Sequence, residues 1–207
     1  MAVPSPLPAS PHPAVSPPDT APPSSAPDPK AQQLHPRKLL EAVQEAHASF
    51  NPGRLTLDSH ADECVAALRL PSAQDETFLR QVLYGLVRYR RLLNAFVNSF
   101  YHNKSGEVLR GDVCIYKIYA YLAIFRLEEI TFPEFRRLVA ATDPHKMAVF
   151  LTYLFDEGNL KEFCRHDWLK IYDKPFVDGT INNLLKWLPQ VTKLVEELSS
   201  IVYAPKK

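Results

Sequence analysis

The chain has 207 residues with 24 basic and 23 acidic side chains, a balance that excludes the strongly basic surface typical of nucleic-acid-binding proteins. Its six glycines form no phosphate-binding loop, and the sequence contains no nucleophile elbow or zinc-protease motif. The composition therefore favours a non-enzymatic protein, and we expect no catalytic residue, no cofactor and no metal site.

Residues 1–36 form a proline-rich segment that differs from the rest of the chain. Twelve of the 19 prolines lie at or before Pro36, and the segment has no aromatic residue and only three charges. Such a composition cannot bury enough apolar surface to offset the entropy lost on ordering the chain. We therefore predict a disordered tail over 1–36 and one all-helical domain over 37–203.

The domain is predicted to be helical from its first residues. Apolar residues repeat with helical spacing over 37–50 and again over about 60–70. Ser59, with Asp62 three residues later, predicts the start of the second helix, and Pro71 predicts its end.

The longest predicted helix covers about 73–102. Ser72 and Asp75 have the spacing of a capping box at its start, and apolar residues return at helical spacing along its whole length. The pattern predicts one unbroken helix that acts as the spine of the domain.

Four residues along one side of this long helix are candidates for partner docking: Arg80, Tyr84, Arg88 and Arg91. Residues 88–91 are also the densest basic cluster in the chain. Such a stripe suits an acidic partner. The alternative, which the near-neutral charge of the domain favours, is an exposed helix face paired with acidic residues elsewhere.

The run Val113–Leu127 is apolar apart from Lys117 and Arg126. As a helix it would span about 22 Å, which is short of the roughly 30 Å hydrocarbon core of a bilayer. A helix that is apolar on all sides must be enclosed by other helices. We therefore predict a buried central helix and no membrane span.

Shorter helices are predicted after the apolar run. Thr131 and Glu134 have capping-box spacing, and Asp143-Pro144 is typical of a helix start. Asn159 is expected to cap a helix that continues to Asp173.

The last helical region is predicted from Thr180 to Val202, after a turn at 174–179, with a bend or restart at Pro189. The pattern as a whole predicts an all-α protein with about eight to nine helices. Both an irregular helical bundle and a short helical stack stay open.

The three cysteines, Cys64, Cys114 and Cys164, lack metal-type spacing and have apolar neighbours. We expect reduced thiols and an intracellular location. His60 and Cys64 are spaced for one helix face, but two ligands are too few for zinc.

Six short stretches carry a resemblance to a known family: Val87-Arg88-Tyr89, Asn98-Ser99-Phe100-Tyr101, Tyr121-Leu122-Ala123-Ile124-Phe125-Arg126-Leu127, Lys146-Met147, Leu154-Phe155-Asp156-Glu157-Gly158-Asn159-Leu160 and Trp187-Leu188-Pro189-Gln190-Val191. They resemble the cilia- and flagella-associated protein 99 family, over roughly residues 37–200. The resemblance implies a non-enzymatic structural component of the axoneme of motile cilia and sperm flagella. It implies cytoskeletal localisation and axonemal partners, among them microtubule-associated or central-apparatus components, with no nucleic acid and no membrane.

A second interpretation, from a different class, also stays open. The chain would be a cytosolic helical adaptor domain in trafficking or signalling, and its proline-rich tail would recruit SH3-type partners. The PxxP element Pro8–Pro11 is the kind of ligand that such domains bind.

Overall fold

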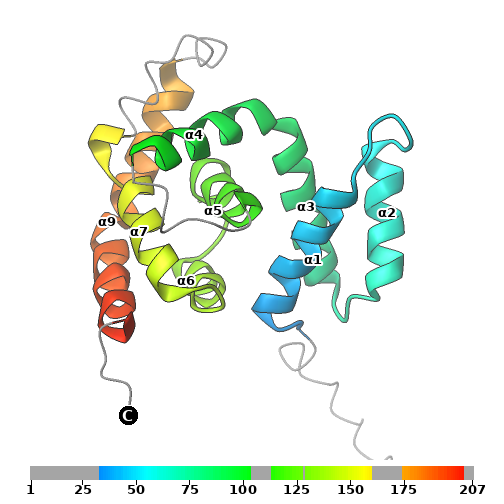
Figure 1. Ribbon diagram of the computed structural model, residues 1–207, viewed down its shortest axis with the longest axis horizontal. Coiled ribbons are helices and arrows are strands. Elements are labelled where there is room, and N and C mark those ends of the chain that lie inside the picture. The colour runs from blue at the N-terminus through cyan, green and yellow to red at the C-terminus, as the bar shows by residue number, and fades with distance from the viewer. Residues whose placement is uncertain (1–32, 104–112, 128, 160–173, 203–207) are drawn as a thin grey trace, which may run out of the picture. The chain divides into compact units, whose positions relative to one another are not determined.

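The computed structural model describes residues 33–103, 113–127, 129–159 and 174–202. Eight α-helices have both of their ends within these ranges, and no strand is found there, which confirms the predicted all-α class (Figure 1). The helices stack on one another around a shared apolar core. Most of the predicted tail and the helix predicted to end at Asp173, which contains Cys164, lie outside the described residues.

The helices are α1 (Pro36–Ser49), α2 (Leu57–Leu68), α3 (Ala73–Arg88), α4 (Arg90–Asn103), α5 (Val113–Phe125), α6 (Phe132–Ala140), α7 (Pro144–Leu154) and α9 (Lys174–Val202). Figure 1 shows α1, α2 and α3 side by side, with α4 leading from the end of α3 across α5. α7 and α9 pack against each other; α9 also contacts α5, and α7 contacts α6.

The predicted helix starts at Thr131 and Asp143 are confirmed. Thr131 accepts a hydrogen bond from the Glu134 backbone N–H, and the Glu134 carboxylate accepts one from the Thr131 N–H at 2.8 Å, a complete capping box. Asp143 accepts from the backbone N–H of Lys146 at 2.9 Å. These side chains satisfy N–H groups that the first helical turn leaves unpaired, so each helix begins where its cap lies.

The Ser72 cap is also present, but its partner has a different role from the one predicted. Ser72 Oγ accepts from the backbone N–H of Asp75 at 3.1 Å. The Asp75 carboxylate, which is buried, accepts from Ser72 Oγ at 2.8 Å and from the backbone N–H of Leu34 at 2.9 Å. It therefore fastens the segment before α1 to the start of α3.

The predicted start of α2 is wrong by three residues. The helix begins at Leu57, because Thr56 rather than Ser59 caps it, with Thr56 Oγ1 accepting from the Ser59 N–H at 3.2 Å. At the other end Arg69 adopts a left-handed conformation with φ of 46° and stops the helix before Pro71.

The predicted unbroken helix over 73–102 is wrong, because the chain breaks at Tyr89. Tyr89 has φ −99° and ψ 19°, and its ring stacks on Phe125 of α5 with centroids 3.8 Å apart. A straight helix of this length would carry its second half past the core. With the break, α3 and α4 both contact α5, and residues of each half, such as Leu86 and Phe96, are fully buried.

The prediction of a turn at 174–179 and of a helix restart at Pro189 is also wrong, because α9 runs as one helix from Lys174 to Val202 with Pro189 inside it. Proline removes one helical hydrogen bond and costs about 3 kcal/mol in a helix interior. Pro189 lies on the exposed side, while Leu184 and Val191 before and after it are buried. Packing on both sides of the proline therefore holds the helix together.

The predicted burial of the apolar run is confirmed. Eight residues of α5 are buried, and α3, α4, α9 and α1 all contact this helix. Phe100 of α4 lies against Tyr116 of α5 and Phe150 of α7, with ring centroids 5.7 and 5.0 Å away. Among the described helices none is long and apolar enough to cross a membrane.

Candidate partner-docking surface

Two of the four predicted docking residues are engaged within the domain. Arg80 forms an ion pair with Asp62 of α2 at 2.7 Å, and Tyr84 donates its hydroxyl to Asp58 of α2 at 2.8 Å. The hydrogen bond that Arg80 donates to Asp62 raises the pKa of Arg80. Burial, followed by the hydrogen bond to Asp58, raises the pKa of Tyr84. These two residues hold α2 against α3, as the alternative interpretation of the stripe expects.

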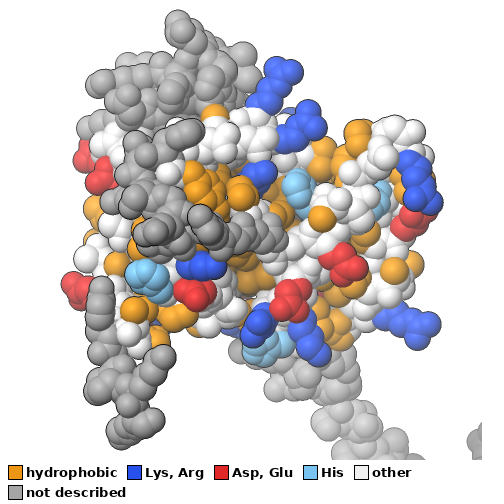
Figure 2. Space-filling model, viewed as in Figure 1, with side chains coloured by type: hydrophobic (Ala, Val, Ile, Leu, Met, Phe, Trp, Pro, Cys, Tyr) orange, Lys and Arg blue, Asp and Glu red, His pale blue; other side chains and the backbone are white. Residues whose placement is uncertain are grey.

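The other two predicted residues, Arg88 and Arg91, are exposed at the junction of α3 and α4. Arg90 between them is exposed as well, and we call these three residues the basic corner. No ion pair is found for any of them in the described part of the chain, and the first turn of α4 contains no acidic residue. Figure 2 shows basic side chains gathered over this junction.

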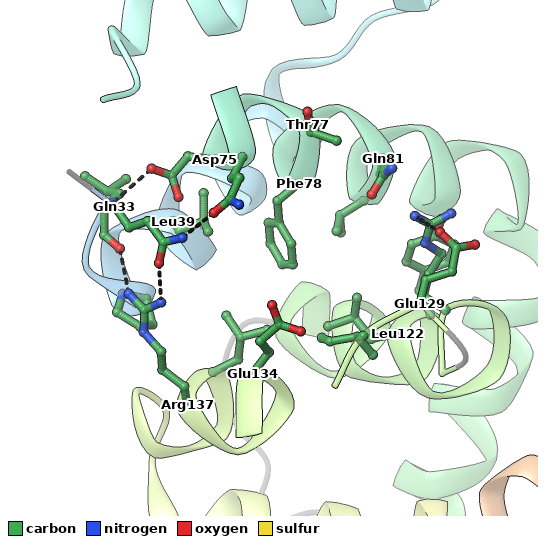
Figure 3. Close-up of a pocket in the computed structure, with 18 of the residues that line it drawn as sticks. Gln33, Leu39, Asp75, Thr77, Phe78, Gln81, Leu122, Glu129, Glu134 and Arg137 are labelled. Carbon is green, nitrogen blue, oxygen red and sulfur yellow. Dashed lines mark hydrogen bonds and ion pairs between the residues drawn. The ribbon is translucent and has the colours of Figure 1, made fainter. Parts of the chain in front are cut away.

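A cavity of about 490 Å³ lies between α1, α3, α5 and α6 (Figure 3). Its apolar lining comes from all four helices and from the segment before α6: Leu39, Phe78, Val82, Leu122, Ile130 and Leu138. Phe78 is only half-buried, and its ring points from α3 into the space above Leu122 and Glu134. Cavities of this size and lining are typical of sites that take an apolar group from a ligand.

One end of the cavity is lined by polar groups that already have partners. The Arg137 guanidinium donates to the Gln33 side chain at 2.9 Å and to the Leu34 carbonyl at 3.3 Å. Gln33 also bonds the side chain of Gln74, and Asp75 accepts from Leu34 as described above. This network, drawn at the left of Figure 3, stabilises the cavity wall.

The opposite end of the cavity borders the basic corner. It is lined by Tyr121 and by an ion pair between Arg126 and Glu129. Burial raises the pKa of Tyr121, and the positive charges of Arg126 and Arg88 oppose that rise. The Arg88 guanidinium lies 5.5 Å from the centre of the Tyr89 ring, and that ring lies 6.3 Å from the Tyr121 ring, so the basic corner and this end of the cavity are neighbours.

Gly85 makes the close approach of α3 and α5 possible at this end. A Cβ atom built on Gly85 would overlap Cε2 and Cζ of the Tyr121 ring. Any other residue would push the ring away, so the position of Tyr121 at the cavity wall depends on this glycine.

The pair His60 and Cys64, considered from the sequence as part of a metal site, has a structural role. His60 Nε2 lies 2.8 Å from the carbonyl oxygen of Ala46 and so must carry the proton and donate it, and Cys64 Sγ lies 3.5 Å from the same nitrogen. Burial, followed by the charges of Glu45 and Glu63, raises the pKa of the Cys64 thiol. A thiol that stays protonated is a poor nucleophile.

The other two cysteines considered from the sequence are Cys114 and Cys164. Cys114 is buried in α5, and Cys164 lies outside the described ranges. Within those ranges no group of three His, Cys, Asp or Glu side chains could hold a metal ion.

Comparisons of the chain with models of known families, with curated proteins and with solved structures find no match. The fold and the surface define an all-α domain with an apolar cavity next to an exposed basic corner.

The cavity was not predicted from the sequence, because its lining comes from segments far apart in the chain. Gly85, in the last turn of α3, was the one local sign that another element comes close there.

Proposed function

We propose that this protein is a non-enzymatic structural component of the axoneme of motile cilia and sperm flagella. It acts as a helical scaffold for other axonemal proteins, among them microtubule-associated or central-apparatus components. The observation that carries the proposal is the resemblance of the chain to the cilia- and flagella-associated protein 99 family.

The residues that carry that resemblance have structural roles in this domain, which supports the proposal of a scaffold. Tyr121–Leu127 spans the end of the buried helix α5 and the residues after it, and Phe100 belongs to the aromatic contacts of the core. Trp187 of α9 lies against Phe132 and Phe135, with ring centroids 5.3 and 5.5 Å away. A likeness in core residues is what a shared helical scaffold would produce.

The polar groups inside the domain also suit a scaffold better than a catalyst. Buried Asp75 and His60 are both hydrogen-bonded to backbone groups of other segments, and the raised pKa of Cys64 keeps its thiol protonated. Catalytic groups are usually poised to react rather than used to tie segments together. These contacts fix the shape of a surface that partners can recognise.

The proposal is tested by locating the tagged full-length chain in motile ciliated cells. We expect the signal along the cilia, and we expect it to stay with axonemes after detergent extraction. A diffuse cytosolic signal would contradict the proposal. If partner binding were then lost on deletion of residues 1–36, the cytosolic adaptor would be the better description.

A further inference from the structure

We infer that the cavity and the basic corner together form one groove that binds an acidic peptide segment of another protein. An apolar side chain of the peptide occupies the cavity, and its carboxylates lie on Arg88, Arg90 and Arg91. This inference concerns peptide binding by the chain itself, so it does not depend on the axonemal function proposed above.

The first support is the alignment of the two parts along α3. Phe78, Gln81, Gly85 and Arg88 are spaced by three, four and three residues, which places them on one side of the helix. Phe78 and Gln81 line the cavity, and Gly85 admits the Tyr121 ring at its end. Arg88 follows on the same side beyond the Tyr121 ring, so an extended peptide would reach the corner by crossing this ring.

The second support is the uncompensated charge of the corner. Arg90 and Arg91 are the first two residues of α4, where the helix dipole disfavours positive side chains. Neither the first turn of α4 nor any ion pair in the described residues neutralises them. Carboxylates of a bound peptide would supply the missing negative charge and form bidentate bonds with guanidinium groups.

The third support is the limited extent of the charge, which favours a peptide over a nucleic acid. Nucleic-acid binding needs basic side chains spread along many successive phosphates. Here the neighbouring Arg80 is already paired with Asp62, and Arg126 is paired with Glu129. Three guanidinium groups beside an apolar cavity match a few acidic residues that follow one apolar residue.

The test uses the full chain and a short fluorescent peptide that carries one leucine followed by a run of glutamates. Fluorescence anisotropy should show saturable binding that weakens as salt is added, because part of the affinity is electrostatic. A peptide in which alanine replaces the leucine should bind more weakly. No binding of the leucine peptide to the unmodified chain would overturn the inference.

Charge reversal at the corner tests its part of the groove. The triple variant R88E/R90E/R91E should bind at least roughly tenfold more weakly. The matched control is K38E/R54E/K193E, which makes the same change in net charge at three exposed residues elsewhere. Equal losses in the two variants would show general electrostatic attraction and would overturn the inference.

Narrowing the cavity tests the apolar part. Gln81→Trp should weaken binding of the leucine peptide and have little effect on the alanine peptide, while Ala66→Trp on the exposed side of α2 should change neither. Circular dichroism and thermal melting confirm that each variant is folded. Unchanged affinity in a folded Gln81→Trp variant, or tighter binding of a single-stranded oligonucleotide of equal charge, would overturn the inference.

Discussion

The helices α5 and α2 both pack against α3, but they are held in opposite ways. α5 is fixed by large apolar rings: Phe100, Tyr116 and Phe150 meet with centroids 4.9 to 5.7 Å apart, and all three residues are buried. Each such ring removes a large apolar area from water, which is the main favourable contribution to folding.

α2 is held by a much smaller apolar contact and by polar pairs at its edge. Apart from the main core, a small apolar cluster lies where α1, α2 and α3 meet, and its buried residues are Ala46, Ala61 and Leu83. The ion pair between Arg80 and Asp62 lies at the surface, where water and salt weaken it. We therefore expect α2 to open locally at a lower free-energy cost than the rest of the domain.

The largest expected effect comes from the aromatic contacts around α5. Phe100→Ala should lower the free energy of unfolding by about 4 kcal/mol, because it leaves a cavity among rings that cannot fill it. Urea unfolding followed by circular dichroism measures the change. Phe50→Ala, beside His60 and only half-buried, is the matched change near α2 and should cost much less. Equal costs would contradict the contrast between the two regions.

The second prediction concerns glycines within helices, where alanine normally adds up to about 1 kcal/mol of stability. At Gly85 the sign should reverse, and Gly85→Ala should cost about 2 kcal/mol because the new Cβ displaces the Tyr121 ring. Gly179→Ala in α9 is the control, since a Cβ there meets nothing within 4 Å. Thermal melting of both variants checks this, and a more stable Gly85→Ala protein would contradict the packing of α3 on α5.

The third prediction compares two tyrosine hydroxyls. Tyr119 is fully buried and donates to the carbonyl oxygen of Leu138 at 2.8 Å, with Thr142 Oγ1 2.7 Å away. Tyr119→Phe should cost about 1 to 2 kcal/mol, since it leaves buried partners unsatisfied. Tyr84→Phe removes a hydroxyl bonded to Asp58 at the surface and should cost clearly less. The comparison fails if the two variants lose equal stability in urea titrations.

The smallest expected effect is at the edge of α2. Asp62→Asn should change global stability by less than about 1 kcal/mol, because the ion pair is exposed. Hydrogen exchange of the α2 amides should nevertheless become faster at low salt, and the difference from the unmodified protein should shrink as salt is added. Exchange that changes equally in α5 would show that the two helices open together.

Much of the fold could be predicted because its determinants are local. The caps at Thr131 and Asp143 depend on side chains three residues from the groups they bind, and the burial of α5 follows from its own composition. The break at Tyr89 could not be predicted, because it accompanies stacking on Phe125, which belongs to a later helix.

The same reason limits what could be predicted of the docking surface. Exposure of Arg88 and Arg91 was expected from the helical pattern, and the structure agrees. The partners of Arg80 and Tyr84 lie on α2, and identifying them requires knowing how α2 packs on α3. The cavity needs the packing of four helices, so no single stretch of sequence contains its signal.

The contact between Gly85 and Tyr121 has a consequence for genetics. In a mutational scan that scores function in cells, nearly every substitution at position 85 should be depleted, as at an active-site residue. The cause would be purely geometric, because the residue contributes no chemical group. Such a scan would distinguish the two kinds of essential position only if Tyr121 were shortened at the same time, since a smaller side chain there should restore tolerance at position 85.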